Sequence, residues 1–441
     1  MTKAYTSIRQ GLPKRRKFEK SVIMKRILEN SLKTNFLGIS KPNNAFYGID
    51  EMQMYFHALI AEHGSGNHIK DVVFDKYRFN LPDQQTVRVR CEKLDVNAME
   101  QVVNHNLREL AMSLPTYNSG FKLGKIKGMN TQKRRSRKSI KRKRQRERDV
   151  DPPQGRYLAI DFTLQPNYTQ KMAEYRLSEH PIAAHLTKDR RKHSTSQFIG
   201  YHTAYDVELG SRQVLGIHML TNIHNPSYKE GWQREPLDLA VRQLVDPILE
   251  EIPIAGITCD GDYYNQRVIQ YFVVHKLDFV IRGKNNPVIS KLINDAKLKS
   301  SLADGEGYEY PSDFHIASRE GTGTSPLRLI IVKRGQELVP LVLPKYSELT
   351  PEQALLVYEE RFGIETVYRE TYKYLPSTCS TSPNYRLALY AFTVWFFNLL
   401  LNYYEIVVIW SPNPTSWHTS LSLIHARFAT LLGQIMGICS Q

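Results

Sequence analysis

The chain has 441 residues, more than a single hydrophobic core usually holds, so we expect two or three domains. Its net charge of +16 favours a polyanionic partner, with nucleic acid ahead of an anionic membrane surface. The cysteines are widely spaced and include no C-x-x-C pair, which argues against a zinc ribbon and a disulfide framework and indicates a reducing cytoplasm. No apolar segment follows the N-terminus, so no signal peptide is predicted.

Residues 1–130 are predicted to form a mainly helical region. Within it, "FNLPDQQTVRVRCEKL" resembles the second half of a helix-turn-helix: Pro82 restricts the turn, Asp83 suits a helix N-cap, and a short helix follows over 84–94. In DNA-binding proteins such a helix enters the major groove. The basic residues of this helix are Arg88, Arg90 and Lys93. An ordinary helical pair with exposed arginines fits the same pattern.

Positive charge is concentrated in residues 133–148, which hold eleven Lys or Arg against the single acid Glu147. Such a block repels itself and cannot bury a core. The consecutive prolines of "DVDPPQG" then end any helix. We therefore predict a basic linker over 131–154 that binds phosphate groups and separates two domains.

Beyond this linker the apolar runs predict a mixed sheet. Strands are expected at "RYLAIDF", on both sides of a turn at Gly210–Ser211, at "IAGITCD" and at "DFVIRG". With a helix before and after the "IAGITCD" strand, the order is that of a ribonuclease-H-like core. A further hairpin is expected within about 300–345, with its turn at Arg334–Gly335, and one long helix over 350–375, with Thr350 as its N-cap.

The segment 387–410 is long and apolar enough to be considered as a membrane span. Asn398, Asn402 and Glu405 interrupt it, however, and no other segment is similar. We therefore predict a buried helix followed by a short strand, and no membrane association. Residues 411–441 are expected to form a C-terminal tail.

Two aspartates come at the ends of predicted strands, Asp161 in "YLAID" and Asp260 in "GITCD". In a ribonuclease-H-like sheet these strands are neighbours, so the two carboxylates should emerge side by side. Like charges held close together are costly unless a cation bridges them, and Mg²⁺ prefers such oxygen ligands. A single aspartate of this kind could equally be an ordinary turn residue.

The late helix is expected to supply a third carboxylate. Glu365 lies within its apolar stripe, where an isolated carboxylate is costly unless it is a ligand. The other glutamates of this helix are expected to be solvated; they are Glu359, Glu360 and Glu370.

Tyr358, Arg361 and Glu365 form the pattern Y-x2-R-x3-E. This string resembles the third motif of DDE transposases from bacterial and archaeal insertion sequences, in the cut-and-paste group with that signature. "LAIDFT" and "TCDGDYYNQRVIQYF" resemble the first and second motifs, and "FVIRGKNN" resembles the segment that follows. The resemblance covers roughly 155–405. It implies an α/β, ribonuclease-H-like catalytic domain over 155–410 with a β-rich insertion before the last catalytic helix, preceded by a helical DNA-binding domain.

The resemblance also implies an activity. Asp161, Asp260 and Glu365 would bind two Mg²⁺ or Mn²⁺ ions, nick the transposon end and let the freed 3′-hydroxyl attack target DNA. Tyr358 and Arg361 would contact phosphates of the end. The implied partners are double-stranded DNA, both terminal inverted repeats and target, and a second copy of the chain in the DNA complex. The implied location is the cytoplasm, with the nucleoid.

The chain departs from the family pattern at two places. The usual Lys seven residues after the Glu is Tyr372 here, with Lys373 one position further, so a DNA contact by Lys373 is less secure. Gly261–Asp262 replaces a common Arg-Gly pair, which makes Asp262 a rival to Asp260.

Three alternatives to an active transposase remain open at this point. A ribonuclease-H-like nuclease or resolvase without strand transfer would share the same metal site. A DNA-binding regulator without enzymatic activity would leave the strand-end aspartates and Glu365 unexplained. An inactive transposase copy would keep the motifs without the reaction.

Overall fold

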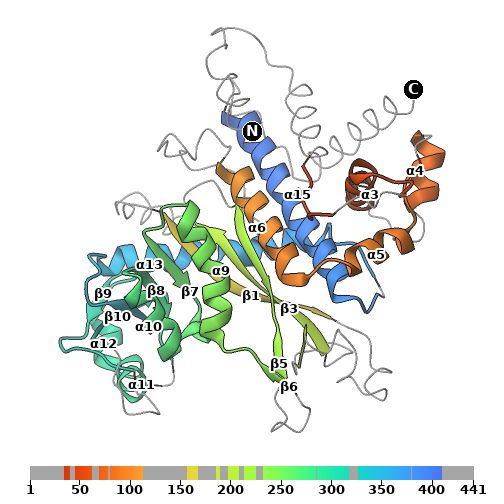
Figure 1. Ribbon diagram of the computed structural model, residues 1–441. Coiled ribbons are helices and arrows are strands. Elements are labelled where there is room, and N and C mark those ends of the chain that lie inside the picture. Colours follow the sequence, from red (N-terminus) through yellow and green to blue (C-terminus); the bar gives the residue numbers. More distant parts are fainter. Residues whose placement is uncertain are drawn as a thin grey trace.

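A computed structural model of the chain describes residues 34–39, 45–61, 69–77, 80–112, 156–166, 185–188, 197–207, 213–224, 232–284, 286–316, 326–378 and 380–409. The basic block, the expected turn at Gly210–Ser211 and the C-terminal tail lie outside these residues. One large mixed sheet runs through the described part, with helices on both of its faces (Figure 1).

The centre of the sheet has the strand order that the sequence predicts. Strand β1 (Tyr157–Pro166) pairs in parallel with β7 (Gly256–Cys259), which pairs in parallel with β8 (Asp278–Arg282). On its other side β1 pairs antiparallel with β3 (Gln197–Asp206), which pairs antiparallel with β4 (Val214–Met219). The resulting order β4-β3-β1-β7-β8 agrees with the predicted ribonuclease-H-like arrangement.

The predicted β-rich segment extends this same sheet. Strand β11 (Glu337–Pro344) pairs antiparallel with β8, and β10 (Leu327–Arg334) and β9 (Gly307–Glu309) follow outward. The hairpin turn lies one residue later than predicted, because Arg334 still pairs with Glu337 across the ladder. Gly335 takes the first turn position with a φ of +64°, which glycine adopts without strain.

Several small elements have no counterpart in the sequence prediction. They are β2 (Leu186–Lys188), which pairs with β3, the two-stranded sheet of β5 (Asn222–His224) and β6 (Trp232–Arg234), and the helices α11 (Pro287–Ile293) and α12 (Ala296–Ser301).

Alternate residues of β1 face two hydrophobic clusters. Leu158 and Ile160 belong to the cluster that contains the apolar faces of α9 (Leu237–Glu251) and α10 (Gln266–Val274). Tyr157 and Ala159, in contrast, belong to the cluster of the late helices. A strand buried on both faces must be apolar throughout, which explains the continuous run "YLAI" just before Asp161.

The prediction of a single long helix over 350–375 is wrong, because the chain forms two helices there. Helix α13 (Pro351–Arg361) begins with the predicted capping box at Thr350 and ends at Phe362, and α14 (Gly363–Tyr372) follows. A Cβ on Gly363 would lie 2.8 Å from the hydroxyl oxygen of Tyr205 on β3. Only glycine therefore lets the start of α14 approach the sheet so closely.

Helix α15 (Pro383–Ile409) is the predicted buried helix. The short strand expected after it is absent, because the helix continues to Ile409. Within the described ranges, no helix combines the length and apolarity needed to cross a membrane. Asn398 is buried, and its side-chain amide is satisfied there by hydrogen bonds to both the N–H and the carbonyl of Val214 on β4.

The N-terminal region contributes α3 (Ile49–Ala61), α4 (Ile69–Tyr77), α5 (Gln84–Glu92) and α6 (Val96–Met112). Helices α3, α4 and α5 lie at one end of the molecule and β9 and β10 at the other, while α6 lies between α15 and the sheet (Figure 1). Their apolar side chains share a hydrophobic cluster with α15. The described N-terminal helices therefore pack directly on the remainder of the fold.

Candidate active site

Asp161 lies on β1 near the point where the parallel pairing with β7 ends. Its Oδ1 accepts the N–H of Phe162 at 2.8 Å, and its Oδ2 lies 3.5 Å from Nη1 of Arg361. Burial raises the pKa of Asp161 to about 6, against the lowering effects of the Phe162 N–H and of Arg361. The charges of Asp260 and Glu365 raise it further, so both carboxylates are close enough to Asp161 to repel it.

Asp260 directly follows β7. Ile160 is paired with Cys259 across the parallel ladder, so Asp161 and Asp260 occupy equivalent positions at the carboxyl ends of neighbouring strands. The Asp260 side chain caps the short turn Gly261–Tyr263 by accepting the N–H of Asp262. This cap, made through Oδ1, holds the Asp260 carboxylate beside the end of β7.

The rival carboxylate, Asp262, is engaged in a different contact. Its Oδ1 accepts a hydrogen bond from Nζ of Lys284 at 2.6 Å, and its side chain is largely exposed. Asp260, and not Asp262, is among the groups whose charge raises the pKa of Asp161. The geometry thus favours Asp260 as the partner of Asp161.

Glu365 does not lie in an apolar stripe, and this part of the sequence prediction is wrong. Glu365 is exposed in the first turn of α14. Its negative charge is one of those that raise the pKa of Asp161. Glu370, predicted to be solvated, is instead buried and accepts a hydrogen bond from Nζ of Lys373. Glu359, also predicted to be solvated, forms an ion pair with Arg334 at 3.2 Å. Because α13 ends at Arg361 and α14 begins at Gly363, one continuous helical wheel over 350–375 does not describe these side chains.

Tyr358 and Arg361 are both buried at the end of α13. The Arg361 guanidinium carbon lies 5.3 Å from the Tyr358 ring centroid and 4.7 Å from that of Phe362. Its Nε is buried and has no hydrogen-bond partner among the described residues. Arg361 is therefore oriented toward Asp161 by two aromatic rings, with donor capacity left unused.

The predicted DNA-binding helix forms as α5, with Asp83 as its N-cap. Arg90 is buried, and its Nη2 donates to the Tyr47 carbonyl at 2.7 Å, so it does not project from the surface. Arg88 is partly exposed and lies 3.4 Å from Glu92 on the same helix. Lys93 is exposed. Of the three basic residues expected on the DNA-binding helix, only Arg88 and Lys93 are accessible.

Within the described residues, no three His, Cys, Asp or Glu side chains come close enough together to hold a metal ion. Asp161, Asp260 and Glu365 are thus electrostatic neighbours, but among the described residues they are not close enough together to hold one ion as a group. The donor set nevertheless suits Mg²⁺, since all three side chains offer carboxylate oxygens. A cation there would offset the repulsion that raises the pKa of Asp161.

One supporting pair was not found from the sequence. The buried Tyr263 hydroxyl lies 2.9 Å from Nδ1 of His202 on β3, which ties the turn after Asp260 to the sheet. Burial holds the pKa of His202 well below its usual range, so the imidazole is neutral. The sequence shows Tyr263 directly after the strand-end aspartate, but its partner His202 is 61 residues away, so the pairing could not be predicted.

No family model and no curated protein matches the sequence. Among solved structures, the chain is similar to a piggyBac transposase in a synaptic complex with hairpin DNA. The identity is 12%, the match covers 96% of this chain and 82% of that chain, and the TM-score is 0.47. It is also similar to an endonuclease V from Bacillus subtilis, with 9% identity over 57% of this chain and 98% of that chain and a TM-score of 0.23. At these scores neither likeness assigns a fold or an activity to the chain.

Proposed function

We propose that the chain is a DDE-type DNA transposase that cleaves the ends of a mobile element and joins them to target DNA. The observation that carries this proposal is the placement of Asp161 and Asp260 at the ends of adjacent parallel strands, with the charge of Glu365 acting on Asp161. Ordinary turn aspartates would not be accompanied by a third carboxylate from a distant helix. The three motifs in the sequence support the same reaction class.

Asp161, Asp260 and Glu365 would hold two Mg²⁺ or Mn²⁺ ions. When bound, such ions activate a water molecule and stabilise the attacking and leaving oxygens of a phosphoryl transfer. The chain's own residues position the substrate. Arg361, whose Nη1 lies 3.5 Å from Oδ2 of Asp161, would orient a DNA phosphate at the carboxylates.

The remaining parts of the chain would supply DNA affinity. The basic linker over 131–154 would bind phosphates without reading sequence, and Arg88 and Lys93 would act from the helical region over 1–130. Lys373 would have to leave its contact with Glu370 to reach DNA. Residues 155–410 would form the catalytic domain and 411–441 a tail, in a homodimer on DNA in the cytoplasm.

The test uses a labelled DNA duplex carrying the inverted repeats found on either side of the coding sequence. With Mg²⁺, the wild-type chain should nick the repeat end and produce a longer, joined product with target plasmid. Asp161→Asn, Asp260→Asn and Glu365→Gln should each abolish both products while DNA binding remains. Glu370→Gln is the matched control, because Glu370 comes from the same helix and should leave both products in place.

The outcomes separate the alternatives. Cleavage without joining would identify a nuclease or resolvase. Specific DNA binding with no metal-dependent cleavage would support a regulator or an inactive copy. Activity that is lost in Glu370→Gln and retained in Glu365→Gln would replace the proposed third ligand.

A further inference from the structure

Tyr372 at the end of α14 contacts the stretch of β1 that carries Asp161. Its hydroxyl lies 2.9 Å from Oγ1 of Thr163 and donates to the Leu164 carbonyl at 3.3 Å. Burial raises the pKa of Tyr372, so the hydroxyl keeps the proton that it donates. Since a phenol has one proton, the same oxygen accepts the hydroxyl of Thr163. Tyr372 occupies the position of the lysine in the motif that this segment resembles, and here that position makes an internal contact.

Thr163 and Asp161 lie on the same face of β1. Successive residues of a strand point to opposite faces, and Ala159 belongs to the cluster of the late helices. Asp161 and Thr163 continue this series. Asp161 meets Arg361 at the end of α13, and Thr163 meets Tyr372 at the end of α14. The two helices therefore contact neighbouring positions on one face of the strand.

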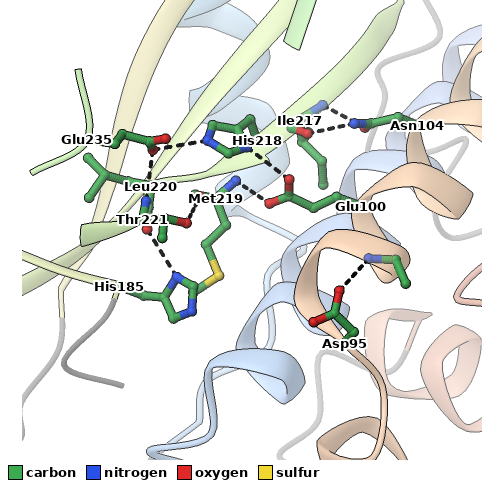
Figure 2. A network of polar contacts seen from close by, with 11 residues as sticks. Asp95, Glu100, Asn104, His185, Ile217, His218, Met219, Leu220, Thr221 and Glu235 are labelled. Atoms are coloured by element: carbon green, nitrogen blue, oxygen red, sulfur yellow. Dashed lines mark hydrogen bonds and ion pairs between the residues drawn. The ribbon is translucent and has the colours of Figure 1, made fainter. Parts of the chain in front are cut away.

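The sheet beneath these contacts is held from the side of β3. The parallel ladder between β1 and β7 ends at Ile160, whereas the antiparallel ladder with β3 continues to Pro166. On its other side β3 pairs with β4, which α6 anchors through Glu100 and Asn104 (Figure 2). The strand face is thus a fixed reference, and the contacts of α14 with it decide where this helix lies.

Helix α14 meets the sheet at both of its ends. Gly363 at its start lies against Tyr205 of β3, and Tyr372 at its end bonds to β1. Glu365 comes seven residues before Tyr372, which is about two turns of an α-helix, so both side chains project from the same side of α14. The contact at Tyr372 therefore fixes the side of the helix that also carries Glu365.

We infer that the hydrogen bond between Tyr372 and Thr163 positions α14 on β1 and thereby sets the reach of Glu365 toward a metal ion at Asp161. Tyr372 is a positioning residue, because it acts through Glu365. Groups that orient a ligand contribute to metal affinity without binding the metal. Among the described residues the carboxylates are not close enough together to hold one ion as a group, so Glu365 has little distance to spare. This inference rests on the proposed function and adds a positioning residue to its metal site.

The experiment compares Tyr372→Phe, Thr163→Val and Thr163→Ser with the control Tyr55→Phe in the full chain. The first two changes each remove one hydroxyl and keep the shape of the side chain, whereas Thr163→Ser keeps the hydroxyl. Tyr55 is a matched control, because its buried hydroxyl also pairs with a hydroxyl, that of Tyr385 on α15, at 3.3 Å. The half-saturating Mg²⁺ concentration is measured twice, from the melting temperature without DNA and from single-turnover cleavage of the inverted-repeat duplex.

Tyr372→Phe should raise the half-saturating Mg²⁺ concentration by roughly 3- to 10-fold in both measurements, as expected from losing one hydrogen bond that holds a ligand in place. Thr163→Val should raise it as well. The double variant should equal Tyr372→Phe alone, since both changes break the same contact. Thr163→Ser and Tyr55→Phe should keep the wild-type value. Saturating Mg²⁺ should restore most of the cleavage rate in Tyr372→Phe, because Glu365 itself remains.

An unchanged or lower half-saturating Mg²⁺ concentration in Tyr372→Phe would overturn the inference. So would an equal rise in Tyr55→Phe, which would reduce the effect to a general loss of stability, or additive effects in the double variant. Asp161→Asn separates these failures from that of the proposed function. A wild type that responds to Mg²⁺ no better than Asp161→Asn, in melting temperature and cleavage alike, refutes the metal site and the inference with it. A wild type that Mg²⁺ stabilises without cleavage refutes the reaction alone, and the melting temperatures then decide the role of Tyr372.

Discussion

The Nδ1 atom of His218 on β4 lies 2.9 Å from a carboxylate oxygen of Glu100 on α6, and this buried contact joins the N-terminal helices to the sheet. The neighbouring Asn104 side chain hydrogen-bonds both the N–H and the carbonyl of Ile217 at 2.8 Å. Side chains of α6 thus satisfy backbone groups that a further strand would otherwise pair. An edge strand covered in this way is protected from pairing with another chain.

His218 should make stability depend on pH. Burial alone would lower its pKa, but Glu100 and Glu235 raise it to about 10. A group whose pKa is raised on folding contributes stability below its unfolded value, near 6.5, and loses that contribution as the pH rises through its folded value. The destabilisation caused by His218→Gln should therefore be largest at pH 6 and shrink toward pH 10.

This difference is measured as the free energy of unfolding in denaturant at pH 6, 8 and 10. His275→Gln serves as the control, since His275 is exposed at the end of α10. A His218→Gln effect of the same size at every pH would show that the imidazole is not charged in the folded protein.

Asp161→Asn should stabilise the protein while abolishing cleavage. Burial and then the neighbouring charges raise the pKa of Asp161 from 3.8 to about 6, so the ionised carboxylate opposes folding at neutral pH. Removing it should raise the free energy of unfolding above pH 6 by up to about 3 kcal/mol, at ~1.4 kcal/mol per pKa unit. The gain should shrink as the pH falls through 6 and be small at pH 4, close to the unfolded value of 3.8.

The measurement is denaturant unfolding in EDTA at pH 4 and pH 7.5. Repeating it with Mg²⁺ adds a second readout, because an ion bound only to the folded state stabilises it. Mg²⁺ should stabilise the wild type more than Asp161→Asn. No stabilisation by the variant at pH 7.5 would contradict the account of Asp161 as a strained carboxylate.

Local patterns in the sequence were sufficient for the strand order. The apolar runs around Asp161 and Asp260 predict parallel neighbours, and the observed ladder between β1 and β7 agrees. The cap at Asp83 and the capping box at Thr350 are also local signals, and both are confirmed. These features depend on residues close together in the chain, which is why they could be predicted.

The errors concern contacts between distant residues. The start of α14 at Gly363 lies against Tyr205, a residue of β3 that no helical wheel includes. On α14, Glu365 is exposed and Glu370 is buried, the reverse of the prediction. Arg90 was one of three basic residues expected on a DNA-binding helix, but its Nη2 donates to the Tyr47 carbonyl. Burial of this kind is a tertiary property without a sequence signal.

The basic residues of α5 and of its C-cap, Lys93, should divide into one that supports the fold and two that bind DNA. Arg90→Ala should destabilise the protein by about 1–3 kcal/mol, because it removes a buried hydrogen bond from a charged donor. Arg88→Ala and Lys93→Ala should change stability by less than about 1 kcal/mol, as expected for exposed side chains. They should instead weaken binding to the cognate duplex by roughly 1–3 kcal/mol if they reach base edges.

Denaturant unfolding and gel-shift affinities for cognate and random duplexes test this division. Weakening on both duplexes alike would assign Arg88 and Lys93 to phosphate contacts. A stable Arg90→Ala protein that loses cognate binding would restore Arg90 as a base-reading residue and contradict the structure.

Arg361→Ala should depress cleavage far more than DNA binding. Its guanidinium is oriented by the rings of Tyr358 and Phe362 toward Asp161, so it acts at one place and adds little to overall affinity. Positioning of a reacting phosphate contributes much of the rate in such sites. Arg361→Lys should recover little activity, because an ammonium cannot reproduce the planar stack and its donors.

Arg334→Ala is the control: Arg334 lies 5.0 Å from the same Phe362 ring but pairs with Glu359. Single-turnover cleavage rates and gel-shift affinities on the same duplex measure the two effects, and equal losses in both assays for Arg361→Ala would reduce this residue to a general DNA contact.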